Sequence, residues 1–339
     1  MRPLLAITAG DPAGIGPEIV VKVLRRPDVH ARCRPLVIGD AATLAAADAS
    51  VHREAAPINV VRNAGEAFFS PGTIDVLQPA EPISGIAPGQ LSAAAGRAAV
   101  MYVRAGAALA RDRVADAIVT APLNKAAIQM AGFAYPGHTE ILADFFGTPR
   151  YSLVLTAQDL FVFHVTTHIA LRRAVEELSH RDVLETIRLA SHFARARGAN
   201  EPIAVSGLNP HAGEDGLFGD EEIATIGPAI QSAVAEGIRA VGPIPADALW
   251  PAAVKGTYHY IVVMYHDQGH APFKAVFGDT GVNVTVGLPI LRTSVDHGTA
   301  FDIAGKGVAR ETSLYEAIEL AVALLPIWPA ATQGLSKTT

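Results

Sequence analysis

Cysteine is almost absent from this sequence. Cys33 is the single cysteine among 339 residues, which excludes an intrachain disulfide and any zinc site that needs two or more cysteine ligands. Positive charge is not in excess either, because 27 Lys and Arg stand against 33 Asp and Glu and give a formal net charge of −6. This balance argues against a protein that binds nucleic acid by counterion release, and against a polybasic protein of the membrane surface.

Long apolar runs are missing as well. The longest, Leu320 to Ala331, is shorter than the ~18 residues of a membrane-spanning helix, and Pro326 and Pro329 interrupt it. The apolar stretch near the N-terminus ends at Ile7 and is too short for the core of a signal peptide. Since half of the residues are hydrophobic, we expect a sizeable core and a cytoplasmic protein without a membrane partner.

The hydrophobic pattern alternates short apolar runs with longer helical stretches, which is typical of α/β architecture. Predicted strands are residues 4–8, 36–39, 117–120, 153–156, 161–167, 203–207, 260–264 and 282–286, of which the fourth and fifth form a hairpin. Predicted helices are residues 17–24, 41–49, 90–111, 181–197, 223–235 and 313–325. The length predicts two domains of about 150 residues each. Because no Ser/Gly-rich linker separates them, we expect two lobes that interleave along the chain.

Glycine concentrates in the segment Gly10–Glu18, between a predicted strand and a predicted helix. Glycines there let the backbone turn sharply and approach a ligand, and the following helix N-terminus favours anions. Neither common nucleotide-binding pattern fits, because Gly-Lys-Ser/Thr is missing and Ile19 stands where a dinucleotide fingerprint has its third glycine. A tight turn and an anion-binding loop are equally compatible with this segment.

Histidine is the one nitrogen or sulfur ligand present in quantity, at 12 residues. His168, His211 and His266 each stand at the end of a predicted strand or in the loop after it. Ligands of α/β proteins gather at the carboxyl ends of strands, where such loops converge. Three imidazoles with an open position suit a catalytic divalent metal, zinc most readily. Each histidine taken alone is better explained as an ordinary core or surface residue than as a ligand.

Charged and polar residues are dense between His266 and Gly307 in an otherwise apolar chain. Lys274 and Arg292 in this stretch suit a phosphate or carboxylate, Arg292 through its planar guanidinium, although surface ion pairs are the alternative. Lys125, in a loop after the strand 117–120, is a candidate base, since desolvation lowers the pKa of a lysine. A solvated loop lysine is equally compatible with the pattern.

Eight segments together point to one known family. They are residues 10–19, 120–125, 137–140, 166–168, 207–214, 245–247, 265–269 and 281–305. In that order they resemble the 4-hydroxythreonine-4-phosphate dehydrogenase family, with its relatives that act on 4-phosphothreonate. The segment 297–307 also resembles the cofactor loop of isopropylmalate and isocitrate dehydrogenases.

The resemblance implies an isopropylmalate dehydrogenase-like α/β fold, with a cleft between two interleaved lobes. Residues 1–125 with 290–339 are the expected cofactor-side lobe. Residues 126–289 are the expected lobe for the metal, the substrate and dimerisation.

The resemblance also implies NAD-dependent oxidation of a secondary alcohol, followed by decarboxylation, in a homodimer. The implied metal ligands, completed across the dimer interface, are His168, His211 and His266, with zinc first and magnesium, manganese or cobalt as alternatives. The implied substrate contacts are His138, Thr139, Lys274, Asn283 and Arg292. The implied cofactor contacts are His297 and Asp302. We place Lys125 as base or proton donor and Asp247 as a carboxylate that either supports other site residues or relays the proton.

His270 departs from the vitamin B6 biosynthetic members, which carry an apolar residue at this position. Relatives that act on phosphothreonate tend to have histidine there, so this residue favours a catabolic role over pyridoxine biosynthesis. Two alternatives stay open: a dehydrogenase of a cis-diol carboxylate from aromatic degradation, and a catalytically inactive metal-binding dimer.

Overall fold

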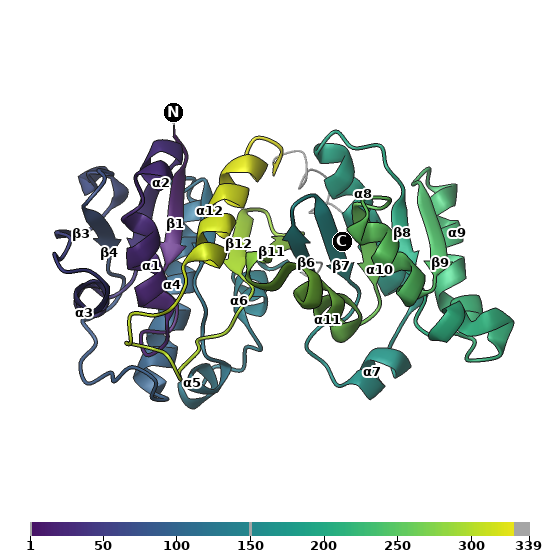
Figure 1. Cartoon of the computed structure of the whole chain (residues 1–339), viewed down its shortest axis with the longest axis horizontal. Coiled ribbons are helices and arrows are strands. Elements are labelled where there is room, and N and C mark those ends of the chain that lie inside the picture. The colour runs from purple at the N-terminus through teal and green to yellow at the C-terminus, as the bar shows by residue number, and fades with distance from the viewer. Residues whose placement is uncertain (1, 149–150, 329–339) are drawn as a thin grey trace. The chain divides into compact units, whose positions relative to one another are not determined.

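The computed structural model describes residues 2–148 and 151–328, which divide into two compact units (Figure 1). The first unit comprises residues 2–148 and 288–326, and the second comprises 151–287 with 327–328. The chain leaves the first unit and returns to it, as an interleaved arrangement requires. The expected lobe boundary at residue 125 differs from this division, because two helices between 125 and 146 pack against a long helix of the first unit. Residues 329–339, which were also assigned to the first lobe, lie outside the described part.

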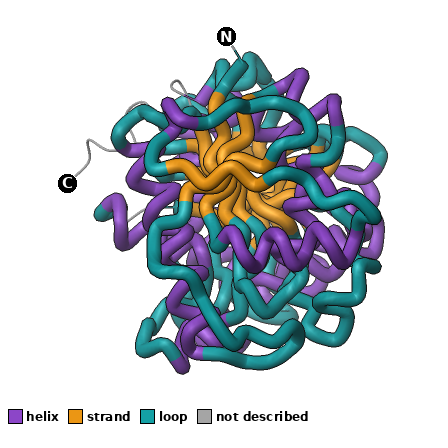
Figure 2. The backbone as a smooth tube through the Cα atoms, turned by 90° about the vertical axis from the view of Figure 1, so that its left-hand side faces the viewer, coloured by secondary structure: helices purple, strands orange, loops and turns teal. Residues whose placement is uncertain are grey.

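The first unit contains a parallel sheet with strand order β3-β4-β2-β1-β5-β12. Its strands are β1 (Leu4–Thr8), β2 (Arg34–Ile38), β3 (Ile58–Val61), β4 (Ile74–Leu77), β5 (Ala117–Thr120) and β12 (Leu291–Val295). β1, β5 and β12 are buried along their whole length, which is typical of parallel strands covered on both faces. Figure 2 looks at this unit from its side and shows strands fanned by sheet twist among helices and loops.

Two groups of helices cover this sheet. The first group is α1 (Gly16–Leu24), α2 (Pro27–Arg32), α3 (Ala41–Val51) and α12 (Thr312–Leu324), and the second is α4 (Ala93–Arg111), α5 (Lys125–Met130) and α6 (His138–Phe146). The side chains of Thr8 and Ile118 face α4, whereas the Thr293 hydroxyl donates to the Ala317 carbonyl of α12. Arg292 is in register with Ile118, so it points to the face that α4, α5 and α6 cover.

The second unit contains a mixed sheet with strand order β11-β6-β7-β10-β8-β9. Its strands are β6 (Ser152–Ala157), β7 (Leu160–His164), β8 (Ile203–Ser206), β9 (Ala240–Ile244), β10 (Tyr260–Val263) and β11 (Val282–Val286). β11, β6 and β7 pair antiparallel, and β7, β10, β8 and β9 pair parallel. Its helices are α7 (Leu171–Glu176), α8 (His180–Ala196), α9 (Gly227–Ala235), α10 (Ala246–Val254) and α11 (His266–Phe277). Leu155, Val162, Ile261 and Phe273 belong to its core.

The predicted strands and helices are present, most of them with small shifts of their ends. The hairpin is confirmed as β6 and β7, and the strand predicted at 282–286 is β11. The helix predicted at 223–235 begins instead with a π-helical turn, η3 (Glu222–Ile226), before α9. Lys125, predicted in a loop, is the first residue of α5, because Asn124 accepts a hydrogen bond from the Ala127 N–H and caps that helix.

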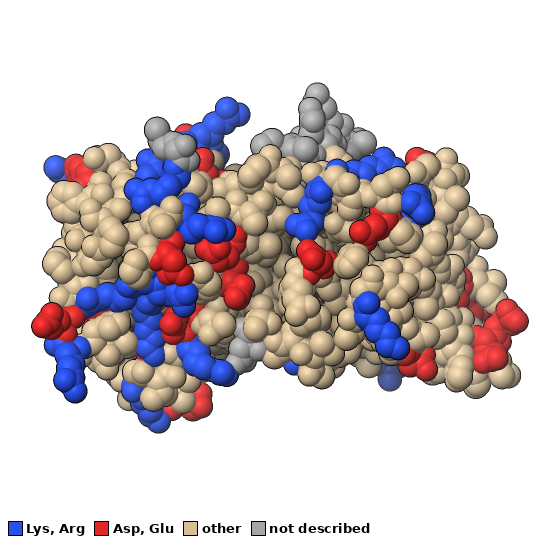
Figure 3. All heavy atoms as spheres, turned by 45° about the horizontal axis from the view of Figure 1, so that its top comes forward, with Lys and Arg blue, Asp and Glu red and all other residues tan. Residues whose placement is uncertain are grey.

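Two further observations concern membrane-spanning segments and the distribution of surface charge. Within residues 2–148 and 151–328, no helix is both long enough and apolar enough to cross a membrane. On the face that Figure 3 presents, basic and acidic side chains are interspersed rather than gathered by sign.

Candidate active site

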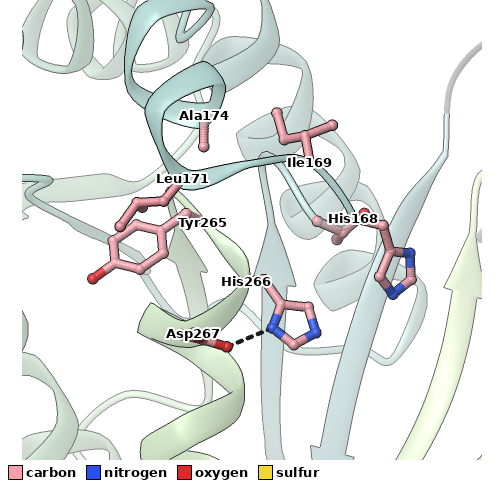
Figure 4. Close-up of a pocket in the computed structure, with 8 residues that line it drawn as sticks. His168, Ile169, Leu171, Ala174, Tyr265, His266 and Asp267 are labelled. Atoms are coloured by element: carbon pink, nitrogen blue, oxygen red, sulfur yellow. Dashed lines mark hydrogen bonds and ion pairs between the residues drawn. The ribbon is translucent and has the colours of Figure 1, made fainter.

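His168 and His266 line one pocket of about 260 Å³ in the second unit (Figure 4). Their segments follow β7 and β10, which are adjacent parallel strands, so both carboxyl ends lie at the same edge of the sheet. The hydroxyl and the N–H of Thr166 both donate to the Met264 carbonyl at 2.8 and 3.2 Å and tie the two segments together. The ring centroids of the two histidines are 5.7 Å apart. The structure thus brings together two of the three expected metal ligands.

The remaining pocket wall is largely apolar. The residues that line the pocket are Thr167, His168, Ile169, Leu171, Ala174, Tyr265, His266 and Asp267. In Figure 4 the two imidazoles lie on one side, and Leu171, Ala174 and Tyr265 form the wall on the other.

His266 is held from two sides. Its Nδ1 pairs with Asp267 Oδ1 at 2.7 Å, and its ring stacks on His270 with centroids 3.7 Å apart. A carboxylate on one ring nitrogen is the usual way to orient a histidine whose other nitrogen binds a metal. The donor set of His168 and His266 therefore fits a divalent ion.

Two buried histidines, His164 and His270, lie next to His266. The His270 Nδ1–H donates to the His266 carbonyl, and the ring of His164 lies 4.8 Å from that of His270. Burial lowers the pKa of His164 to about 4, and burial together with His164 and His266 lowers that of His270 to about 2. A Cβ on Gly269 would meet His164 Nε2 at 2.1 Å, so glycine is required for this packing. His164 did not stand out in the sequence, because it ends a strand that is otherwise apolar.

His211 lies in the turn η2 (Pro210–Gly216), after β8. Its side chain is 66% exposed, and its Nδ1 is 3.6 Å from Glu214 Oε2. Across the described ranges, no group of three His, Cys, Asp or Glu side chains is arranged to hold a metal ion. Completion of the ligand set by a second subunit stays a prediction.

The first unit holds a buried cationic site. Arg292 on β12 is only 3% exposed, and its Nε and Nη2 donate to Thr120 Oγ1 at 3.2 and 2.8 Å. Burial lowers the pKa of Arg292 to about 9, while the carboxylate of Glu140 acts in the opposite direction. A guanidinium desolvated in this way is stabilised by an anion that binds beside it.

His138 and Thr139 begin α6, which places main-chain N–H groups of a helix N-terminus in the same region. His138 is hydrogen-bonded to the Ala121 backbone, and burial and the nearby Arg292 hold its pKa well below the ordinary value. Its Nε2 is buried without a hydrogen-bond partner among the described residues. Because this ring is neutral, its orphaned nitrogen accepts a hydrogen bond and fits a substrate hydroxyl, while Arg292 fits the anionic group of the expected substrate.

The remaining expected substrate and catalytic residues are divided between the units. Lys274 and Asn283 lie on α11 and β11 of the second unit. Lys125 is exposed at the start of α5 in the first unit, and Asp247 is exposed near the start of α10 in the second. Their roles stay predictions.

The glycine-rich segment forms one wall of a second pocket, of about 190 Å³, in the first unit. Pro12, Gly14 and Pro17 line it together with α3 residues, Pro88 and Gly305. The Ile15 N–H donates to the Thr299 carbonyl at 3.0 Å, so the segment is fastened to the loop that carries His297 and Asp302. The segment is thus more than a tight turn, because it shapes a pocket with the expected cofactor loop.

A buried carboxylate that the sequence did not single out organises these loops. Asp11 is completely buried, accepts the Ala13 N–H at 2.8 Å and is hydrogen-bonded to the Asn124 backbone. Asn124 in turn donates from Nδ2 to Thr299 Oγ1 at 3.4 Å. Burial raises the pKa of Asp11 to about 6.

The family model of the pyridoxal phosphate biosynthetic protein PdxA matches residues 31–321, most of the chain. The chain belongs to the PdxA family. The resemblance seen in the sequence motifs is therefore confirmed, and the matched range includes the candidate histidines and Arg292.

Relatives within the PdxA family are similar over their whole lengths. The chain is 55% identical to a D-threonate 4-phosphate dehydrogenase of Bordetella bronchiseptica, over 99% of this chain and 97% of that protein. A crystal structure of a 4-hydroxythreonine-4-phosphate dehydrogenase from Klebsiella pneumoniae matches with a TM-score of 0.85 at 45% identity, covering 96% and 100% of the two chains. The expected α/β fold is thus confirmed as that of PdxA structures.

A less similar solved structure is that of a protein with another named activity. The structure of a terephthalate 1,2-cis-dihydrodiol dehydrogenase from Burkholderia xenovorans matches with a TM-score of 0.62 at 32% identity, covering 95% and 98% of the two chains.

Proposed function

We propose that this protein is an NAD-dependent and metal-dependent dehydrogenase that oxidises and decarboxylates a phosphorylated 3-hydroxy acid. D-threonate 4-phosphate is the substrate we favour, because the Bordetella bronchiseptica relative that carries this name is 55% identical. 4-Phosphohydroxy-L-threonine is the second choice, in line with the name of the Klebsiella pneumoniae structure. We place the enzyme in the cytoplasm.

The observation that carries this proposal is the buried guanidinium of Arg292 next to His138. Burial lowers the pKa of Arg292 to about 9, so a phosphate dianion that binds there gains a charge-assisted contact with a group already desolvated. In the proposal, His138 Nε2 and Thr139 at the start of α6 complete the contact with substrate. Lys274 and Asn283 bind the remaining polar groups of the acid.

His168 and His266, with His211, would hold the divalent metal. Bound there, the metal supplies Lewis acidity that lowers the pKa of the substrate hydroxyl and stabilises negative charge during loss of carbon dioxide. Asp267 keeps the His266 ring oriented through the 2.7 Å contact with Nδ1. In the proposal Lys125 takes the hydroxyl proton, and Asp247 relays it.

The cofactor would bind along the pocket formed by the glycine-rich segment and the loop of Gly305, with contacts from His297 and Asp302. The hydride of the substrate carbon goes to NAD, and the resulting β-keto acid loses carbon dioxide. Loss of carbon dioxide leaves an enolate, which takes up one proton on carbon to give the ketone product. One NADH would be formed per substrate, and the hydroxyl proton would leave through Lys125.

A substrate panel tests the proposal by absorbance at 340 nm, with NAD and a divalent metal. D-threonate 4-phosphate should give NADH and carbon dioxide, and its dephosphorylated form should lose well over tenfold in kcat/KM. Removal of metal with a chelator should abolish turnover, and added zinc should restore it. Equal use of both forms, or full activity without metal, would contradict the proposal.

A cis-diol carboxylate is the second candidate substrate, because the terephthalate cis-dihydrodiol dehydrogenase matches at 32% identity. A preference for the diol in the same panel would transfer the assignment to that reaction. No turnover on any member, with metal and cofactor bound, would favour the inactive metal-binding dimer.

We further propose that the active form is a homodimer whose subunits share the metal ligands. A mixture of inactive His211→Ala and His266→Ala proteins should regain part of the activity if these ligands come from different chains. A fully active monomer in light scattering would refute this arrangement.

A further inference from the structure

The turn that carries His211 has an unusual backbone. Five successive residues, from His211 to Asp215, have φ angles of 54°, 52°, 82°, 45° and 53°. This is the left-handed region, which side chains of L-residues avoid, and only Gly213 among the five is glycine. Local preference therefore does not hold His211 in place, and contacts from elsewhere in the fold must do so.

Glu222 supplies several of these contacts, beside the bonds from the Ala212 N–H to the Asn209 carbonyl and from the Phe218 N–H to the Gly213 carbonyl. Its side chain is buried, and Oε1 accepts the main-chain N–H groups of Leu208 and Asn209, both at 2.7 Å. Oε2 accepts the side-chain Nδ2 of Asn209 at 2.9 Å. The carboxylate thus binds the chain just before Pro210, at the entrance to the left-handed turn.

The turn is wrapped closely around this carboxylate. A Cβ on Gly213 would lie 2.8 Å from Glu222 Oε2, and a Cβ on Gly207 would lie 3.1 Å from Oε1 and 2.9 Å from the Cα of Ala212. Both glycines are therefore needed for the close approach, and Glu222 fills the interior of the turn.

The side chain of Glu222 comes from a π-helical turn. Glu222 is the first residue of η3, which takes the place of the first turn of the α-helix predicted at 223–235, and α9 follows directly. π-Helical turns are rare and occur frequently at functional sites.

We propose that Glu222 is a positioning residue for His211: its carboxylate organises the left-handed turn so that the imidazole is presented for metal binding. This inference rests on the proposed function, in which His211 is a metal ligand. It assigns to Glu222 no contact with substrate, cofactor or metal.

Glu222→Gln is the principal test, because it preserves size but replaces one accepting oxygen with an N–H donor. If the amide oxygen keeps the two main-chain bonds, the new amide N–H group faces the side-chain N–H group of Asn209. Asn209 cannot turn over freely to compensate, since its Nδ2 also donates to Glu221 Oε2 at 2.6 Å. Glu221→Gln is the matched control, because Glu221 holds Asn209 only through that side-chain bond.

The experiment measures zinc affinity of the full-length, metal-free protein by competition with a chromophoric chelator, and the visible spectrum of the Co²⁺ form. Glu222→Gln should weaken zinc binding about ten- to hundredfold, as for other groups that orient a ligand, and should change the Co²⁺ spectrum. Glu221→Gln should stay within about threefold of wild type, and the thermal unfolding midpoints of the metal-free variants show whether each is folded.

Asn209→Ala provides a second route if Glu222→Gln does not fold. It removes the side-chain bond to Glu222 and leaves the main-chain bonds, so zinc affinity should fall less, by roughly three- to tenfold. Wild-type zinc affinity in a folded Glu222→Gln protein, or in Asn209→Ala where only that variant folds, would overturn the inference.

His211→Ala separates the inference from the function beneath it. If this variant binds zinc as tightly as wild type, His211 is no ligand, and the proposed metal site and the role of Glu222 fall together. If it binds weakly while Glu222→Gln binds normally, only the role of Glu222 is refuted.

Discussion

Two glycines of α4 offer a matched test of how closely this helix packs. Gly96 and Gly106 are both buried within the same helix, Ala93–Arg111. A Cβ on Gly96 would lie 2.1 Å from the Ala127 carbonyl oxygen and 2.6 Å from the Ile128 nitrogen, which are backbone atoms of α5. A Cβ on Gly106 would meet the Thr8 Cγ2 at 3.4 Å, an ordinary van der Waals contact.

The opposite environments predict opposite effects on stability. In both variants alanine gains about 0.8–1 kcal/mol over glycine from helix propensity. Gly106→Ala should therefore be neutral or more stable by up to about 1 kcal/mol. In Gly96→Ala, α5 must move by more than ~1 Å to restore a normal contact, so the overpacking cost should reach about 3 kcal/mol, the upper end of the usual range.

Propensity cancels between the two variants, so the difference in their free energies of unfolding isolates the steric cost. We expect Gly96→Ala to be the less stable by about 3 kcal/mol. Urea unfolding followed by circular dichroism measures this difference. Because Lys125 begins α5, Gly96→Ala should also lower kcat, whereas Gly106→Ala should not. Equal stability of the two variants would refute the close helix approach.

Three further outcomes follow from buried groups. Arg292→Lys loses the two bonds from Nε and Nη2 to Thr120, so KM for the phosphorylated substrate should rise roughly tenfold while KM for NAD stays constant in steady-state assays. Burial raises the pKa of Asp11 from 3.8 to about 6, so the fold loses stability as pH rises from about 4 to about 6, by up to roughly 3 kcal/mol. Asp11→Asn should remove this loss. Its free energy of unfolding in urea, relative to that of wild type, should therefore be higher at pH 7.5 than at pH 4. The same relative free energy at both pH values would contradict the raised pKa of Asp11. Burial raises the pKa of Cys33 to about 12, so a thiol reagent at pH 8 should label the native protein at least ~100-fold more slowly than the urea-unfolded protein, and rapid native labelling would refute its burial.

Many of the strands and helices could be predicted from the amino-acid sequence. β1 and β5 are short apolar runs, β11 alternates valine with polar residues, and α8 has a strong amphipathic pattern, so the hydrophobic pattern alone identifies them. α11 was missed as a helix because Pro272 and several site residues interrupt its apolar period. Such a helix is held by its tertiary contacts rather than by its pattern.

The candidate site was likewise predicted in part from the sequence and in part set by tertiary contacts. The sequence by itself determined that His168, His211 and His266 follow strands, and its motifs identified the PdxA family. Only the tertiary structure decided that β7 and β10 are neighbours, which places His168 and His266 in one pocket.

The roles of Glu222 and Asp11 could likewise not be predicted from the sequence pattern. Each appears in the sequence as one acidic residue among 33, and only the folded chain buries its carboxylate against main-chain N–H groups. Hydrophobic period reports which face of a segment is buried, whereas strand order and hydrogen bonds between loops depend on contacts between residues far apart in the chain.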